Sequence, residues 1–278
     1  DFEIDNSSSS FESSLSKNFP LNTELESYLT FRGKAKGSWL LSVSPNSESF
    51  SVRTRHSFIS LPDEGYKPRK FDPRAGYGAM TFYDYASPIE DDLHVKYIRR
   101  HRLIKKYPEK EVSEAIEPII YYLDRGVPEP VKSALLDGGA WWNEAFEAAG
   151  FKNAFQIKVL PEGADMLDVR YNVIQWVHRS TRGWSYGSSV VDPRTGEIIK
   201  GHVSLGSLRV RQDYLIAEGL LRPYGKENNP DDLMKEMAIK RLRQLSAHEI
   251  GHTLGLSHNF ISSARGRKSV MDYPHPLI

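Results

Sequence analysis

A strand-like pattern of apolar and polar positions lies between residues 26 and 61. Phe50–Ile59 alternates apolar and polar residues, and Ser38–Val43 is a shorter, mostly apolar run. The residues between them, Pro45-Asn46-Ser47, are typical of a turn. This pattern predicts a β hairpin or a small sheet.

Two stretches of low apolar content flank this pattern. Residues 1–20 include the serine-rich run Asn6–Ser10, which predicts a flexible start to a β-rich N-terminal region spanning residues 1–60. Residues 62–92 are rich in Pro, Gly, Asp and Tyr, a composition typical of irregular structure. We therefore expect an irregular connector over residues 61–115.

Regular periodicity begins near residue 116. Helical spacing of apolar residues predicts helices over residues 131–149 and 210–221, and from residue 230 into residue 248. Strands are predicted at residues 118–123, 155–160, 171–178, 188–191 and 197–205, the last two joined by a turn containing Pro and Gly. These elements predict a second domain over residues 116–278.

Composition narrows the possible partners. The chain has 278 residues, and 37 basic side chains nearly balance 36 acidic ones, so bulk charge does not favour nucleic acid or a membrane surface. The basic run Lys96–Lys106 could bind nucleic acid, but a solvated face balanced by the glutamates that follow it is the favoured interpretation. We expect no nucleic-acid partner, and the absence of an apolar run near 18 residues predicts no membrane-spanning helix. The oligomeric state stays open.

Cysteine is absent from the chain. Disulfides, thiolate metal ligands and a cysteine nucleophile are therefore excluded.

Residues 248–258 carry the strongest chemical signal, a stretch of the form HExxHxxGxxH. His248 and His252 lie one turn apart on the same helix face, so both imidazoles can reach one ion, and Glu249 can present a carboxylate beside it. Gly255 allows the left-handed conformation that ends a helix, after which the chain can return to deliver His258 as a third ligand. Three neutral nitrogens and one open position are typical of a catalytic zinc site, where bound water is acidified.

This motif is specific. With each residue type at about one in twenty, the full pattern should occur by chance in roughly one chain of this length in ten thousand. In addition, Ser269-Val270-Met271-Asp272-Tyr273 follows, which has the form of the Met-turn that accompanies such motifs.

With both motifs, the C-terminal half resembles a metzincin zinc metallopeptidase. More closely, residues 71–276 resemble bacterial zinc-dependent metalloproteases formerly catalogued as domains of unknown function. Besides the zinc motif, the matching phrases are Tyr171–Val177, Thr181–Trp184 and Asp192–Glu197. The resemblance implies an α+β fold: a metzincin-like catalytic domain, with a twisted, mostly parallel sheet, a backing helix and an active-site helix, preceded by the small β-rich N-terminal region.

The resemblance also implies roles for individual residues. His248, His252 and His258 are expected to bind Zn²⁺, and Glu249 is expected to act as the general base on zinc-bound water in a zinc-dependent endopeptidase. Tyr273 is expected to approach the zinc or to hydrogen-bond the oxyanion, although a packed tyrosine is the alternative. Met271 is expected to form a hydrophobic floor without binding metal.

Two other functions are compatible with the motif. The chain could be a zinc-stabilised, non-catalytic binding protein, or a zinc hydrolase of a non-peptide amide. Retention of Glu249 favours catalysis, because a structural zinc site needs no base and is normally closed by a fourth ligand. We therefore expect a peptide or protein substrate, held along the exposed strand that we predict at Ser185–Val191.

Further expectations concern the remaining histidines and the ends of the chain. His178 and His202 are interpreted as hydrogen-bonded structural residues. The resemblance implies a secreted or periplasmic location, and a chain that begins Asp-Phe-Glu without a signal peptide predicts a processed or excised product. Because metzincins continue beyond the Met-turn, we also expect a catalytic domain truncated after it.

Overall fold

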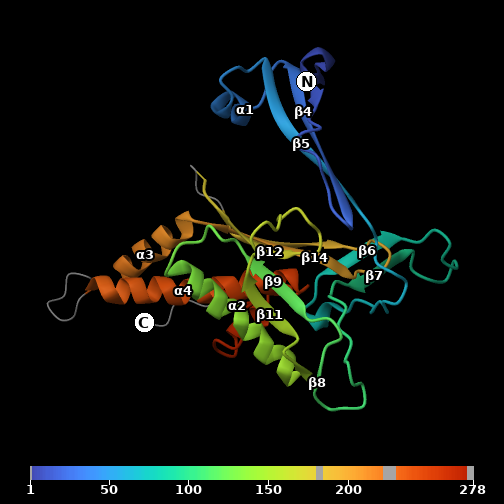
Figure 1. Ribbon diagram of the computed structural model, residues 1–278, viewed down its shortest axis with the longest axis vertical. Coiled ribbons are helices and arrows are strands. Elements are labelled where there is room, and N and C mark those ends of the chain that lie inside the picture. The colour runs from blue at the N-terminus through green and yellow to red at the C-terminus, as the bar shows by residue number, and fades with distance from the viewer. Residues whose placement is uncertain (1, 180–183, 222–229, 274–278) are drawn as a thin grey trace. The chain divides into compact units, whose positions relative to one another are not determined.

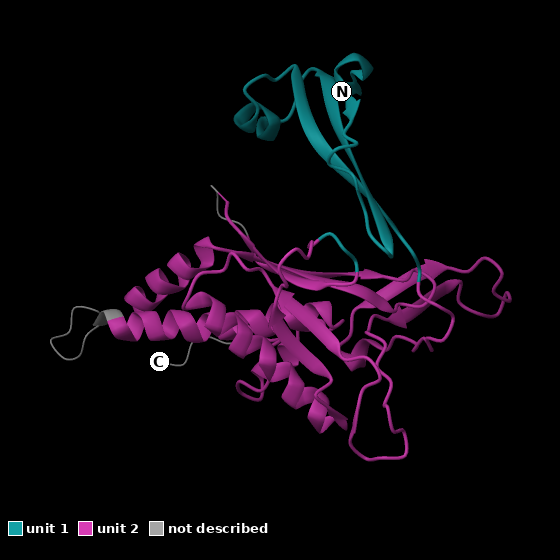
Figure 2. Cartoon of the chain, viewed as in Figure 1, with its two compact units in different colours: residues 1–61, 167–169 teal, residues 62–166, 170–278 magenta. Residues whose placement is uncertain are grey.

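The computed structural model describes residues 2–179, 184–221 and 230–273. Its elements are shown in Figure 1. The chain forms two compact units, residues 1–61 with 167–169 and residues 62–166 with 170–278 (Figure 2). Within the described ranges, no helix combines the length and the apolar character that a membrane crossing requires.

The first unit is built on a long antiparallel hairpin. Strand β4 (Asn22–Gly33) pairs along its length with β5 (Ser49–Ile59). Three short strands, β1 (Phe2–Ile4), β2 (Ser10–Phe11) and β3 (Lys17–Asn18), also pair with β4, and residues Asn6–Ser8 form the 3₁₀ turn η1. Polar pairs across the hairpin join its strands: the Arg55 guanidinium donates to Glu26 at 2.8 Å and the Ser57 hydroxyl to Glu24 at 2.6 Å.

Two parts of this unit differ from the sequence expectation. Ser38–Val43, predicted as a strand, forms the helix α1. The strand paired with β4 is β5, and a segment without a strand partner satisfies its own backbone groups as a helix. Trp39 is 81% exposed, so its apolar character reflects no buried face. The serine-rich start, expected to be flexible, contributes β1, β2 and β3 to the sheet.

A five-stranded sheet forms the centre of the second unit, in the order β11-β9-β12-β14-β13. Its strands are β9 (Ile119–Leu123), β11 (Phe155–Val159), β12 (Asn172–Val177), β13 (Tyr186–Val191) and β14 (Ile198–Gly206). The first three pairings along this order are parallel, and β13 pairs antiparallel with β14 at the edge. The sequence predicted a domain that combines helices with a β-sheet, and the structure confirms this combination.

Three helices accompany this sheet: α2 (Val131–Ala148), α3 (Leu208–Leu220) and α4 (Pro230–Thr253). The helices α2 and α4 pack against each other and share a buried core with the sheet, including Leu135, Ile174 and Ile250. Gly138 permits this packing, because a Cβ there would lie 2.1 Å from the Arg243 carbonyl oxygen of α4. Packing against α2 and the sheet core therefore helps to position α4.

The segment between residues 62 and 115 is more regular than the predicted connector. It contains the 3₁₀ turn η2 (Pro73–Ala75), an antiparallel hairpin of β6 (Ala79–Tyr83) and β7 (His94–Ile98), and β8 (Ser113–Glu114), which pairs with β10 (Phe151–Lys152). Its turn-rich composition concealed these strands because each is short, and the partner of β8 is also distant in sequence.

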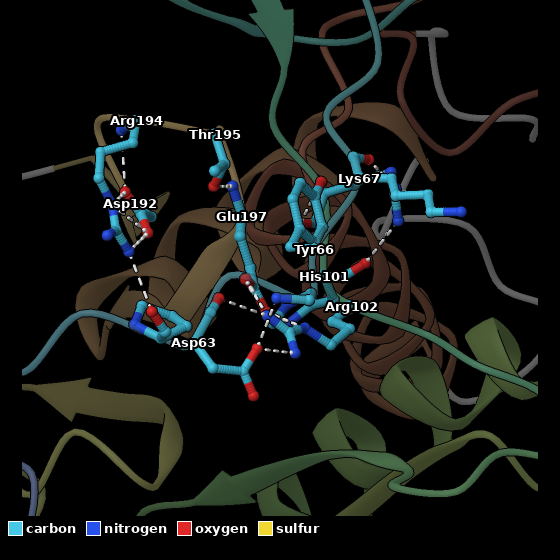
Figure 3. A network of polar contacts seen from close by, with 12 residues as sticks. Asp63, Tyr66, Lys67, His101, Arg102, Asp192, Arg194, Thr195 and Glu197 are labelled. Atoms are coloured by element: carbon cyan, nitrogen blue, oxygen red, sulfur yellow. Dashed lines mark hydrogen bonds and ion pairs between the residues drawn. The ribbon is translucent and has the colours of Figure 1, made fainter.

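A polar network fastens this segment to the β13–β14 turn (Figure 3). The Arg102 guanidinium donates to Glu197 from two nitrogens, each at 2.8 Å, and to Asp63 at 2.6 Å. Arg194, in the turn, donates to the buried Asp192 and to the Pro62 carbonyl. The basic run that contains Arg102 therefore contributes to intramolecular packing.

Candidate metal centre

The helix α4 carries His248, Glu249 and His252 in its last two turns and ends as the sequence predicts. Gly255 has a φ of 98°, the left-handed conformation expected for it. The Leu256 amide donates to the Gly251 carbonyl at 3.0 Å, and the Gly255 amide to the His252 carbonyl at 3.1 Å. These two bonds form a Schellman motif, which satisfies the last carbonyls of the helix and reverses the chain.

The returning chain is held by residues 76–78. The Gly78 amide donates to the Gly255 carbonyl at 2.7 Å, and the Ser257 amide donates to the Gly76 carbonyl at 2.9 Å. Space is tight here, because a Cβ on Gly255 would lie 1.9 Å from the Arg99 carbonyl oxygen. This short pairing delivers His258, the next residue, to the end of α4.

Three imidazoles converge at this point. Nε2 of His252 lies 3.2 Å from Nε2 of His248 and 3.0 Å from Nε2 of His258. Zinc–nitrogen bonds of roughly 2.0–2.1 Å place tetrahedral nitrogens roughly 3.3–3.4 Å apart. The observed separations are within a few tenths of an ångström of that value.

Backbone carbonyls set the tautomers of two of these rings. Nδ1 of His248 donates to the Val270 carbonyl at 2.7 Å, and Nδ1 of His252 donates to the Leu256 carbonyl at 2.9 Å. A carbonyl only accepts, so each proton is on Nδ1 and each Nε2 presents a lone pair to its neighbours. Lone pairs that face one another at this distance require a cation between them, so these residues fit a bound zinc ion.

Burial favours the neutral, metal-binding form of the histidines. Desolvation lowers the pKa of His248 to about 4, and the hydrogen bond to the Val270 carbonyl only partly opposes it. Desolvation also lowers the pKa of His258, with a smaller contribution from the nearby His252. These two rings therefore do not need to lose a proton at neutral pH to bind a metal.

Glu249 is buried beside this cluster. Desolvation raises the pKa of its carboxyl to about 7, opposed by a hydrogen bond from the Gly187 amide and by the charge of Arg209. Strand β13 comes so close to α4 that a Cβ on Gly187 would lie 2.1 Å from the Glu249 carbonyl oxygen. A carboxyl with a pKa near neutrality suits a group that accepts a proton and then gives it up.

Met271 packs beneath the helix. Its side chain is 3% exposed, and a Cβ on Gly251 would lie 2.3 Å from its sulfur. Gly251 thus makes room for the thioether between the turns that carry His248 and His252. This packing agrees with the structural role predicted for Met271.

Tyr273 approaches the cluster from the end of the Met-turn. Its hydroxyl lies 2.8 Å from Nε2 of His258, and its side chain is 63% exposed. Burial of the phenol raises its pKa, and the charge of Glu249 adds to this effect. The structure therefore places the Tyr273 ring beside the histidine cluster.

The other two histidines considered lie outside the cluster. His178 bonds the Ser207 hydroxyl through Nδ1 at 2.9 Å, and Nε2 of His202 lies 3.2 Å from Gln175. Within the described ranges, His248, His252 and His258 form the one group of candidate metal ligands. Both side chains are therefore within hydrogen-bond distance of a polar neighbour, as expected for them.

Sequence reasoning missed the residues that surround the Glu249 carboxyl. Gly187 donates to Glu249, and Arg209, held by the buried Asp213 at 3.1 Å, lies close enough to influence its charge. A glycine inside a strand can signal a close backbone approach, so Gly187 was detectable in principle. Arg209 carried no such signal, because it comes from α3 and its position depends on how the helices pack.

Two known families match different segments of the chain. Residues 2–106 match a family described as a domain of unknown function (DUF5117), and residues 230–278 match a family described as Met-zincin. No curated protein matches the chain significantly. The Met-zincin match and the three convergent histidines together support a metzincin-like zinc protease.

Proposed function

We propose that the chain is a zinc-dependent endopeptidase with His248, His252 and His258 as zinc ligands. The observation that carries this proposal is the convergence of three Nε2 atoms, two of them with their tautomers set by backbone carbonyls. We also retain, from the resemblance alone, the proposal of a bacterial protein in a secreted or periplasmic location.

In the proposed peptide hydrolysis, the zinc ion and the side chains around it have different roles. Zinc, when bound, lowers the pKa of a water molecule and polarises a carbonyl. The Glu249 carboxylate accepts the proton of the attacking water and passes it to the nitrogen of the leaving amine. The Tyr273 hydroxyl, which already hydrogen-bonds His258, can donate to the oxygen on which negative charge develops.

The edge strand β13 offers a place for the substrate backbone. Because the Gly187 amide faces Glu249, it points away from β14, and the alternation along a strand turns the Ser189 amide to the same side. An extended peptide added to this edge would accept main-chain hydrogen bonds and bring its scissile carbonyl to the metal. Such pairing tolerates many side chains, as an endopeptidase requires.

The donor set favours catalysis over a structural role for the metal. A structural zinc is normally enclosed by four protein ligands, whereas the described part of the chain brings three histidines together. A buried carboxyl with a pKa near 7 next to them has no purpose in a structural site.

Metal analysis and a library of fluorescence-quenched peptides test the proposal. We expect one zinc per chain after loading, cleavage of peptides, loss of cleavage with a chelator and recovery with added zinc. Zinc binding without cleavage of any peptide would support the non-catalytic alternative if acylated amines are also left intact. Hydrolysis of such amides alone would support the non-peptide alternative, and a chain that binds no zinc would refute all three.

A further inference from the structure

A cavity of about 460 Å³ lies next to the turn that follows α4. It has no part in the proposed reaction. Its apolar wall comes from α2, from β10, from the turn that follows α4 and from Tyr77, which pairs with this turn. The residues that form this wall include Tyr77, Trp142, Phe146, Phe151, Leu254 and Leu256. Its volume is in the range of small-molecule sites, roughly 300–1,000 Å³, which combine such walls with a few polar groups.

The charged side chains that line this cavity are cationic. Arg69 and Arg100 line it, and among its described lining residues none is acidic. The Arg100 guanidinium lies 4.5 Å from the centre of the Tyr66 ring and donates to the Lys67 carbonyl at 2.8 Å, so its position is fixed. Its Nε is buried without a hydrogen-bond partner. In the part of the chain that the structure describes, no carboxylate pairs with Arg69 or Arg100.

The cavity adjoins the turn that builds the metal centre. Leu254 and Leu256 flank Gly255, and the Leu256 carbonyl accepts the hydrogen bond that orients His252. Tyr77 pairs with Leu256 in the short bridge that holds the returning chain. A molecule in the cavity would therefore contact both sides of this turn.

From the apolar wall and the two arginines that lack a carboxylate partner, we propose that this cavity binds a small amphiphile with an apolar chain and one carboxylate, such as a medium-chain fatty acid. The chain packs against the aromatic and leucine side chains, where it leaves water. The carboxylate lies at the arginine side, where charge-assisted hydrogen bonds replace its hydration. This site is separate from the zinc-binding nitrogens, and the proposal does not depend on peptidase activity.

Calorimetric titration of the whole chain with octanoate, below its micellar concentration, tests this site. We expect one octanoate per chain, and octanol should bind at least roughly tenfold more weakly because it lacks the charge. The absence of octanoate binding, or equal affinity for octanol, would overturn the proposal.

Matched variants locate the site. Ala145 lies on the exposed face of α2 and lines the cavity, so Ala145→Phe should fill it and weaken octanoate binding at least roughly tenfold. Ala140→Phe places the same ring at an exposed position of α2 that does not line the cavity, and it should bind as the parent does. Arg69→Gln should reduce the affinity for octanoate towards that for octanol, whereas Arg125→Gln, at an exposed distant position, should not.

Circular dichroism checks that each variant is folded. Parental octanoate affinity in both folded Ala145→Phe and Arg69→Gln would contradict the assignment of the binding site.

Discussion

At the scale of single residues, the protonation of the two helix-borne ligands is set by the backbone. His248 and His252 each donate Nδ1–H to a carbonyl, which leaves both Nε2 lone pairs directed at one point. These carbonyls belong to Val270 and Leu256, whose side chains have no role in the metal site. The motif predicts the ligands by residue type, whereas the carbonyls that orient them are backbone groups, and Val270 lies outside the motif.

Tyr273 allows a test of its proposed contact with substrate. Tyr273→Phe removes a hydroxyl that lies 2.8 Å from Nε2 of His258 and should lower kcat, by up to about a hundredfold, with zinc content retained. Tyr85→Phe, an 83% exposed position, is the matched control and should leave the kinetics unchanged. Steady-state kinetics on one cleaved peptide measure the effect. An unchanged kcat for Tyr273→Phe would assign the phenol to packing alone.

His101 should make the folded state sensitive to acid. Burial lowers the pKa of this ring to about 4, although a hydrogen bond with Thr253 opposes the shift. Unfolded histidine titrates near pH 6.5, so between about pH 6.5 and 4 the unfolded chain binds a proton that the folded chain does not. The free energy of unfolding should therefore fall as the pH falls through this window, by at most about 3 kcal/mol from this residue.

The variant His101→Gln isolates this contribution. Denaturant unfolding of the zinc-free protein at pH 7 and pH 5 should show a smaller loss of stability in the variant than in the parent. Equal losses in the two proteins would show that His101 does not carry the effect.

At the scale of elements, the end of α4 decides whether the third histidine arrives. Gly255→Ala would force a side chain into a positive φ of 98° and against the Arg99 carbonyl oxygen. We expect a loss of at least about 1–2 kcal/mol of stability and weaker zinc binding, because His258 follows this turn. Gly219→Ala on α3, where a Cβ has no atom within 4 Å, should not destabilise the protein. Parental zinc affinity in folded Gly255→Ala would contradict this role for the turn.

Strand β13 is the element on which we propose that substrate lies. Ser189→Pro removes an outward amide and also the hydroxyl that donates to the Thr253 carbonyl at 3.0 Å. Ser189→Ala removes only the hydroxyl. If peptide pairs here, Ser189→Pro should raise KM well beyond the effect of Ser189→Ala, with zinc content unchanged. Equal KM values in two folded variants would show that substrate does not use this amide.

At the scale of the whole molecule, the predictions that rest on a local sequence pattern agree best with the structure. Apart from the two-residue β10, the strands and helices between residues 119 and 220 agree with their apolar periodicity, and the metal motif occupies eleven consecutive residues. Ser38–Val43 was misassigned because its apolar side chains lie in solvent. The hairpin of β6 and β7 was missed because strand pairing, rather than local composition, stabilises it.

In the candidate site too, the residues of a local motif could be predicted, and those brought in from elsewhere in the chain could not. The three histidines and Glu249 could be named from spacing, since helix geometry brings them together. Gly78, which holds the returning chain, and Gly187, which contacts Glu249, lie far from the motif in sequence. Their contributions depend on the completed fold of the second unit.

The zinc content and peptidase activity of Glu249→Gln, measured on the same preparation, test the central claim most directly. The variant keeps the shape of the side chain and all three histidines, but it lacks the proton acceptor. We predict one zinc per chain in both proteins, and cleavage slower by at least about a hundredfold in the variant. Parental cleavage by zinc-loaded Glu249→Gln, or a parent that binds zinc through other residues, would contradict the account.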